Sequence, residues 1–123
     1  MADGLELLHE SVRRLRDFTG RAANDPALTQ LETALGEVGA NVLTHGSPPG
    51  GFGPVDYSLR LETNSAVATF ADAGPPVHNH LARPMPAPTS EQGRGLALAR
   101  MLLDELGYQR DGDTNLWRLV KRL

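Results

Sequence analysis

The chain has 123 residues, no cysteine, a net charge of −3, and 40% apolar and 22% charged residues. This length fits one domain with one core, and the composition is that of a soluble globular protein. The charge leaves no general basic field for direct binding to nucleic acid or to an acidic membrane surface. The lack of cysteine excludes disulfides, thiolate zinc sites and a cysteine nucleophile.

The sequence also carries no recognisable address signal. No apolar run approaches the roughly 18 to 20 residues that span a bilayer. The first residues, MADGLELLHESVRR, place acidic residues before any basic one and contain no apolar h-region, which argues against a secretory signal. We therefore expect a single cytoplasmic domain over residues 1–123.

Two helices are predicted in the first part of the chain. Over residues 5–23 apolar side chains recur every three or four positions, as on a helix with one buried face: Leu5, Leu8, Val12, Leu15 and Phe18. Asp25 followed by Pro26 is a helix start signal, an N-cap residue before a proline at the first helical position. This second helix runs to about Thr44 and turns an apolar stripe to the core: Leu28, Leu31, Leu35, Val38 and Val42.

The remaining elements are three or four strands and one helix. Residues 55–62 alternate between apolar and polar and predict a half-buried strand. After a turn at 63–65, the more continuously apolar residues 66–71 predict its hairpin partner, in a central position. A helix buried on most sides is predicted over residues 95–106, followed by strands near 107–110 and 116–123. The order predicts an α+β two-layer sandwich, with one mixed or antiparallel sheet and helices on one face.

Three stretches carry side chains that suggest chemistry. The first is on the second helix, where Glu37, Asn41 and His45 are spaced i, i+4, i+8 and therefore share one stripe beside the apolar one. A carboxylate and an amide oxygen one turn apart can hold a hard cation or a water near it. The same stripe is equally typical of the solvated face of an amphipathic helix.

The other two stretches lie at predicted element ends. Asp72, followed by Ala73-Gly74-Pro75, ends the second strand, where its carboxylate could accept a hydrogen bond from an exocyclic amine. The same residues are also common turn chemistry. The stretch Gly93-Arg94-Gly95-Leu96 opens the predicted third helix, and glycines at a helix N-terminus expose N–H groups that suit phosphate.

Taken together, the order and spacing of the three stretches resemble the GHKL (histidine-kinase-like) ATPase superfamily, and most closely its anti-sigma-factor serine/threonine kinase branch. The stretch from Glu37 to Asn41, continuing to His45-Gly46, resembles its N-box. The stretches at Asp72 and at Gly93 resemble its two glycine boxes, and the ending NLWRLVK resembles its last strand. The resemblance covers about residues 5–123 and implies the two-layer GHKL fold.

The resemblance implies a role for each matching residue. Asn41 would hold Mg²⁺, which bridges the phosphates of ATP, and Glu37 would be the general base. Asp72 would bind the adenine amino group, with Gly74 packed close to the base. The backbone N–H groups of Gly93 and Gly95 would cradle the phosphates, with Arg94 and Leu96 beside them in the second glycine box. Residues 76–92 would form the ATP lid.

The implied function is that of a Mg²⁺- and ATP-dependent protein serine/threonine kinase. Its phosphate acceptor would be a serine on an anti-sigma-factor antagonist of the STAS type, and its second partner a sigma factor held inactive. The alternative is a non-catalytic nucleotide-binding module whose lid gates a regulatory partner. A homodimer is a further implied assembly, although the leading strand that helps to form it in relatives is missing or very short. Asn115 stands where some relatives have a threonine that contacts the nucleotide.

Three other readings of the sequence have less support. His78 and His80, with His45, could indicate a metal site, but no thiolate or acidic neighbour completes a ligand set. His9 followed by Glu10 resembles the phosphoacceptor box of a histidine kinase, which would need a two-helix hairpin ahead of the ATP domain. A chaperone- or gyrase-type ATPase would carry large additional domains. The arginines of the first helix are expected on a solvated face or partner patch: Arg13, Arg14 and Arg16.

Overall fold

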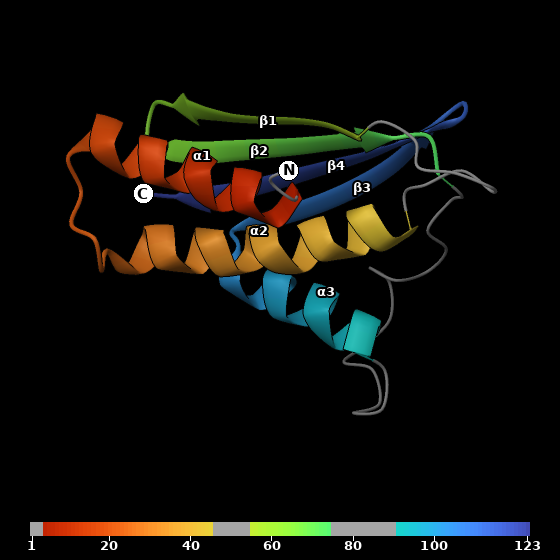
Figure 1. Cartoon of the computed structure of the whole chain (residues 1–123), viewed down its shortest axis with the longest axis horizontal. Coiled ribbons are helices and arrows are strands. Elements are labelled where there is room, and N and C mark those ends of the chain that lie inside the picture. The colour runs from red at the N-terminus through yellow and green to blue at the C-terminus, as the bar shows by residue number, and fades with distance from the viewer. Residues whose placement is uncertain (1–3, 46–54, 75–90) are drawn as a thin grey trace.

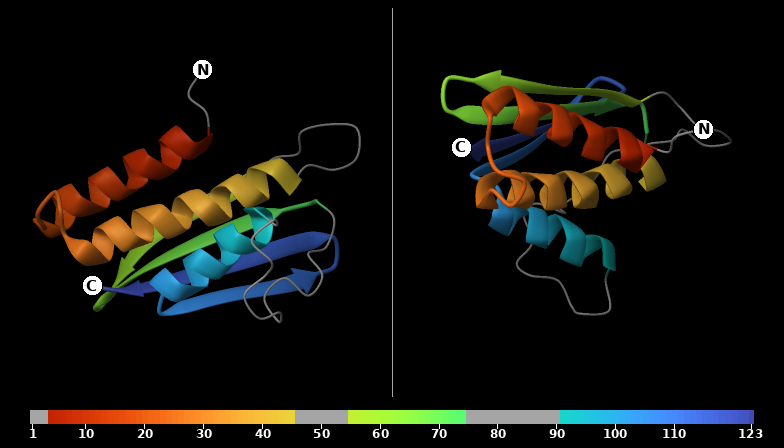
Figure 2. Two further views of the ribbon diagram at one scale, coloured as in Figure 1. Left: turned by 90° about the horizontal axis from the view of Figure 1, so that it is seen from below. Right: turned by 60° about the vertical axis from the view of Figure 1, so that its left-hand side comes forward.

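The structure, a computed structural model, describes residues 4–45, 55–74 and 91–123. Three helices form one layer and a four-stranded sheet the other, so that the helices cover one face of the sheet (Figure 1; Figure 2). In chain order the elements are α1 (Gly4–Thr19), α2 (Pro26–His45), β1 (Val55–Glu62), β2 (Ser65–Asp72), α3 (Glu91–Leu102), β3 (Glu105–Asp111) and β4 (Thr114–Arg122). The predicted α+β two-layer class is confirmed.

The sheet is antiparallel throughout, with the strand order β1-β2-β4-β3. The continuously apolar strand β2 lies between β1 and β4, so its predicted central position is confirmed. Two-residue connections close both hairpins, since Glu62 pairs with Ser65 and Asp111 pairs with Thr114. Gly112 adopts φ 59° in the second connection, a conformation that glycine adopts without steric cost.

The core lies between the two layers. Alternate residues of β2 and β4 point to the helices, as the two-residue period of a strand requires. Phe70 and Trp117 are directly opposite each other on this face and are 3% and 2% exposed. Against them pack the apolar stripes of all three helices: Leu8, Val12, Leu28, Leu31, Leu35, Val38, Leu96 and Ala99. Each leucine or valine among them contributes about 1.5–3 kcal/mol relative to exposure.

The first two helices begin and end for identifiable reasons. α1 ends at Thr19, four residues before its predicted end, because Gly20 adopts φ 72°. Phe18, predicted to face the core, is 79% exposed, so that prediction was wrong. Asp25 caps α2 as predicted: its Oδ2 accepts the N–H of Leu28 at 3.0 Å, and its Oδ1 accepts Arg21 Nη1 at 3.0 Å. The backbone bond and then the Arg21 guanidinium lower the pKa of Asp25.

α3 differs most from expectation. It spans Glu91–Leu102, about four residues earlier than predicted, because β3 already begins at Glu105. It is also not buried on most sides, since Met101 is 70% exposed and Leu98 is 38% exposed. Its buried stripe is narrow and continues just past its end: Leu96, Ala99 and Leu103. The prediction from apolar composition therefore overestimated how much of this helix is covered by the sheet and α2.

Candidate functional site

A buried carboxylate and a buried amide face each other where β2 ends and β4 begins. Asp72 is directly opposite Asn115 in the antiparallel ladder, and the two residues are 4% and 1% exposed. Nδ2 of Asn115 donates to Oδ1 of Asp72 at 2.9 Å, and the backbone N–H of Gly74 donates to the same oxygen at 2.8 Å. Because a buried carboxylate is costly without hydrogen bonds, these donors hold Asp72 in one orientation.

The amide of Asn115 is itself held in one orientation. Its Oδ1 accepts the hydroxyl of Tyr108 at 2.5 Å and Nη1 of Arg110 at 3.0 Å. Arginine can only donate, so the amide atom that faces Arg110 must be the carbonyl oxygen. The NH₂ group must then face Asp72. Asn115 is thus a fixed donor to the carboxylate and not a group that is free to turn.

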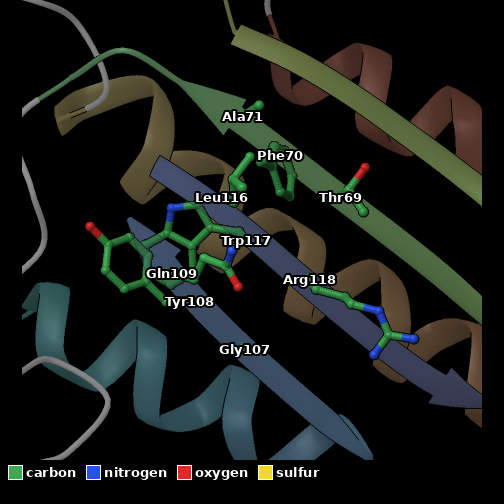
Figure 3. A pocket seen from close by; sticks show the side chains of 9 residues that line it. All are labelled: Thr69, Phe70, Ala71, Gly107, Tyr108, Gln109, Leu116, Trp117 and Arg118. Carbon is green, nitrogen blue, oxygen red and sulfur yellow. The ribbon is translucent and has the colours of Figure 1, made fainter. Parts of the chain in front are cut away.

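The position of the Tyr108 hydroxyl is set by the core. Tyr108 is directly opposite Trp117 in the ladder between β3 and β4. Their ring centroids are 4.8 Å apart at an angle of 54°, and the two rings lie side by side in Figure 3. Tilted aromatic pairs of this kind are favourable beyond their buried area. The contact therefore fixes the ring whose hydroxyl reaches Asn115.

The backbone of Gly74 is tied to the same network. Its carbonyl oxygen accepts Nη1 of Arg110 at 2.7 Å and lies 3.3 Å from Nδ2 of Asn115. Among the residues that the structure describes, both hydrogen bonds to the carboxylate of Asp72 end on Oδ1. Oδ2 is therefore the oxygen left to accept a hydrogen bond from the amine of a ligand.

A second carboxylate, that of Glu37, lies where α2 meets α3. A Cβ atom at Gly95 would lie 2.6 Å from Oε2 of Glu37, which is too close for any side chain to be accommodated without movement. Glycine at this position therefore lets the α3 backbone approach the carboxylate. Asn41 is one turn further along α2, and both side chains are half-buried. Their oxygens are the donor type that Mg²⁺ prefers, so this part of the α2 surface fits a hard cation.

The predicted site elements come together at one end of the molecule. The end of β2, the start of β4, the last turns of α2 and the first turn of α3 all lie on the same side in Figure 1 and Figure 2. Gly93 was predicted to precede α3 and Gly95 to begin it, but they are its third and fifth residues. The N–H of Gly93 is still in the first turn, where no intrahelical partner exists, whereas the N–H of Gly95 is not. Leu96 is 2% exposed in the core, so only its backbone could meet a ligand.

Some predicted residues fall outside the description. The side chains of Arg94 and His45 and all of residues 75–90, including His78, His80 and most of the predicted lid, lie outside the described residues. Within the described ranges, no group of three or more histidine, aspartate or glutamate side chains is placed to hold a metal ion. His9 instead contacts Glu32, with Nδ1 2.9 Å from Oε2, on the exposed surface between α1 and α2.

A different hollow of about 510 Å³ lies on the face of the sheet that the helices leave open (Figure 3). Gly107 contributes no side chain there, and the rim is formed by Thr69, Gln109, Leu116 and Arg118. These residues alternate along their strands with those that face the helices. The hollow is therefore separated from Asp72 by the sheet and is not part of the candidate site.

Comparison with known proteins identifies the fold and the family. The model of the histidine kinase-like ATPase domain matches residues 5–121. The chain belongs to this family. A histidine kinase-like ATPase domain is an ATP-binding domain. No curated protein matches.

Solved structures show the same fold at low sequence identity. The catalytic domain of the histidine kinase ThkA, in a nucleotide-free form, superposes with a TM-score of 0.62 at 13% identity, over 98% of this chain and 92% of that one. The Acinetobacter baumannii histidine kinase AdeS gives 0.57 at 14% identity, over 77% of this chain and 46% of that one. This chain thus spans less than half of AdeS. In the part of the chain that the structure describes, we find no helix long and apolar enough to cross a membrane.

The residues missed by sequence reasoning are those that support Asp72. Tyr108 and Arg110 were not considered for a role, and Asn115 was noted only as a departure from relatives. A signal was available for Asn115. Asn115 lies two residues before Trp117 and therefore on the same, buried face of the last strand. In an antiparallel sheet the start of that strand lies beside the end of β2.

Proposed function

We propose that the domain binds Mg²⁺-ATP and acts as a protein serine/threonine kinase of the anti-sigma-factor type. Its substrate would be a serine on a STAS-type antagonist, and its second partner a sigma factor or a similar regulator. The observation that carries the proposal is the carboxylate of Asp72, held through Oδ1 at the end of β2 with Oδ2 left to accept a hydrogen bond. An adenine amino group is the matching donor.

The chain's own residues suit the remaining parts of the reaction. Phosphoryl transfer needs positioning and charge neutralisation more than covalent chemistry from the protein. Asn41 would hold Mg²⁺, which neutralises phosphate charge when it is bound. The first turn of α3, with the N–H of Gly93, would meet the phosphates. Glu37 would accept the proton of the serine hydroxyl as that oxygen bonds to the γ-phosphorus and ADP leaves.

Nucleotide binding is tested by titration calorimetry with ATP and ADP, with and without Mg²⁺. We expect binding by the wild-type chain that requires Mg²⁺ and weakens in Asn41→Ala. Glu37→Gln should leave binding nearly unchanged, because that side chain is assigned to proton transfer. A folded wild-type chain that binds neither nucleotide would contradict the whole assignment.

The kinase assignment is tested separately, with γ-³²P-labelled ATP and purified STAS-domain proteins from the same genome. A phosphoserine ester survives acid, whereas phosphohistidine does not, so acid treatment distinguishes a serine kinase from a histidine kinase. We expect an acid-stable label on the STAS protein that is lost with Glu37→Gln. Binding of ATP and of the partner without any labelling would favour the alternative, a nucleotide-dependent interaction module.

A further inference from the structure

The two oxygens of the Asp72 carboxylate are engaged unequally. Among the described residues, Oδ1 accepts both hydrogen bonds, from Nδ2 of Asn115 at 2.9 Å and from the N–H of Gly74 at 2.8 Å. A carboxylate oxygen has about two lone-pair positions, so these donors fill Oδ1. We infer that Asn115 is a positioning residue that selects adenine over guanine, because it fills the oxygen that guanine would need. The inference rests on the proposed nucleotide binding and concerns which base the site accepts.

The two purine bases make different demands on a carboxylate. Adenine offers a single donor group, its exocyclic amine, with the acceptor N1 beside it, so one carboxylate oxygen satisfies it. Guanine offers two adjacent donors, its N1–H and its exocyclic amine, and carries the carbonyl oxygen O6 where adenine has the amine. A carboxylate holds two adjacent donors by using both of its oxygens side by side. A carboxylate with one oxygen already filled therefore fits adenine and rejects guanine.

The Asn115 amide is held in place, so a base cannot push it off Oδ1 without cost. Asn115 is 1% exposed and lies in one row across three strands, opposite Asp72 on β2 and opposite Arg110 on β3. Its own oxygen accepts Nη1 of Arg110 at 3.0 Å and the hydroxyl of Tyr108. Turning the amide would break these hydrogen bonds and leave buried polar groups unpaired. The order of carboxylate, amide and guanidinium along the row is therefore fixed by the sheet.

The backbone of Gly74 offers guanine no substitute for the filled oxygen. Its N–H donates to Oδ1 of Asp72, and its carbonyl oxygen accepts Nη1 of Arg110 at 2.7 Å and lies 3.3 Å from Nδ2 of Asn115. Nε of Arg110 donates to the carbonyl of Gly112 at 3.0 Å, which ties the guanidinium to the β3–β4 turn. A base thus meets Oδ2 of Asp72. If guanine took the pose of adenine, its O6 would face that oxygen, and two acceptors repel each other.

A series of nucleotides tests the inference on the wild-type chain. GDP differs from IDP only by the exocyclic amine of its base, so a carboxylate with both oxygens open would bind GDP more tightly than IDP. In calorimetric titrations with Mg²⁺, we expect IDP and GDP to bind equally, each about tenfold or more weaker than ADP. GDP bound about tenfold more tightly than IDP would overturn the inference but not the proposed nucleotide binding. A folded chain that does not bind ADP would contradict both.

Removing the amide should relax the choice of base. Asn115→Ala leaves one described donor on Oδ1, so GDP should bind about tenfold more tightly than IDP, and the preference for ADP over GDP should fall about tenfold. A purely structural role of Asn115 would weaken both nucleotides alike and keep the preference.

Tyr108→Phe is the matched control for this substitution. It weakens the same network, while Arg110 still holds Asn115 with Nδ2 on Asp72. Its preference for ADP over GDP should therefore equal that of wild type, whatever its affinity for ADP. Circular dichroism confirms that both variants are folded. An unchanged preference in folded Asn115→Ala, or an equal relaxation in Tyr108→Phe, would refute the inference.

Discussion

The carboxylate of Asp72 and the amide of Asn115 are joined by a 2.9 Å hydrogen bond across the β2–β4 ladder, and both side chains are almost completely buried. They come from residues 43 positions apart in the sequence. The bond leaves one oxygen of the carboxylate uncommitted among the described residues and fixes the direction in which it points. The first prediction concerns that oxygen.

Replacing Asp72 by Asn should weaken nucleotide binding while preserving the fold. Asparagine keeps an acceptor at the Oδ1 position for Asn115 and Gly74, but it presents NH₂ where Oδ2 would accept the adenine amine. Because hydrogen bonds to charged groups contribute about 1.5–3 kcal/mol, the dissociation constant for ADP should rise about tenfold to hundredfold. Calorimetric titration measures it, with Asp113→Asn in the exposed turn as the control. Unchanged ADP binding in folded Asp72→Asn would remove Asp72 from the site.

Truncating the support should destabilise the protein in graded steps. Among the described residues, Asn115→Ala leaves the buried carboxylate with one donor and removes the oxygen that accepts from both Tyr108 and Arg110. The free energy of unfolding should therefore fall by about 1–3 kcal/mol. Tyr108→Phe removes a single donor, and Arg110 still holds Asn115, so its effect should be about 0.5–1.5 kcal/mol. Urea denaturation measures both. An Asn115→Ala variant as stable as wild type would show that the network does not position Asp72.

Two glycines near Glu37 should respond oppositely to the same substitution. A Cβ at Gly36 meets nothing within 4 Å, so Gly36→Ala should stabilise α2 by about 0.5–1 kcal/mol. A Cβ at Gly95 would meet Oε2 of Glu37, which must turn aside. Because that carboxylate ends a flexible side chain, we expect Gly95→Ala to reduce phosphate transfer more than stability.

Thermal unfolding and the labelled-ATP assay measure the two responses of this glycine pair. Gly36→Ala should lose no transfer activity. The prediction fails if both variants stabilise the protein and both retain full activity, because Glu37 would then tolerate displacement.

The N-cap of α2 should make stability depend on pH in the acidic range. Hydrogen bonds from the Leu28 N–H and Arg21 lower the pKa of Asp25 below its ordinary 3.8. A lowered folded pKa contributes stability that is present above the unfolded value and is lost as pH falls through the folded value. Wild type should therefore exceed Asp25→Ala in denaturation midpoint at pH 7, and the gap should narrow below about pH 4. A gap independent of pH would exclude the ionised cap.

The elements and layers could be predicted from the sequence because they depend on local period and caps. The alternation in β1 and the Asp25-Pro26 start of α2 set element type and boundary within a few residues. The end of α3 could not be predicted, because apolar composition did not indicate that β3 would already begin at Glu105. Phe18 fits the helical period of α1 and still lies at the surface, since period specifies a face but not how far the sheet extends beneath it.

The sequence indicated the candidate ligand-binding residues but not the residues that hold them in place. Glu37, Asn41 and Asp72 were predicted as site residues from motif spacing, and the structure brings their elements to one end of the molecule. The supporting groups depend on the pairing register of β3 with β4 and of β4 with β2, which places Tyr108, Arg110 and Asn115 beside Asp72. The two-residue turn sets the register of the β3–β4 hairpin, but β4 pairs with β2 from a distant part of the sequence, and no local pattern specifies that pairing.

The β2–β4 ladder also separates the candidate site from the end of the chain. Asp72 and Asn115 form its first pair, and Ser65 and Arg122 form its last, seven residues away, or about 24 Å. The N–H of Leu123 is anchored there by the carbonyl of Asn64 at 2.9 Å. A fluorophore, a surface tether or a fused reporter attached after Leu123 would therefore be held at the opposite end of the sheet from Asp72. There it can report ligand binding at Asp72 without occupying the ligand's space.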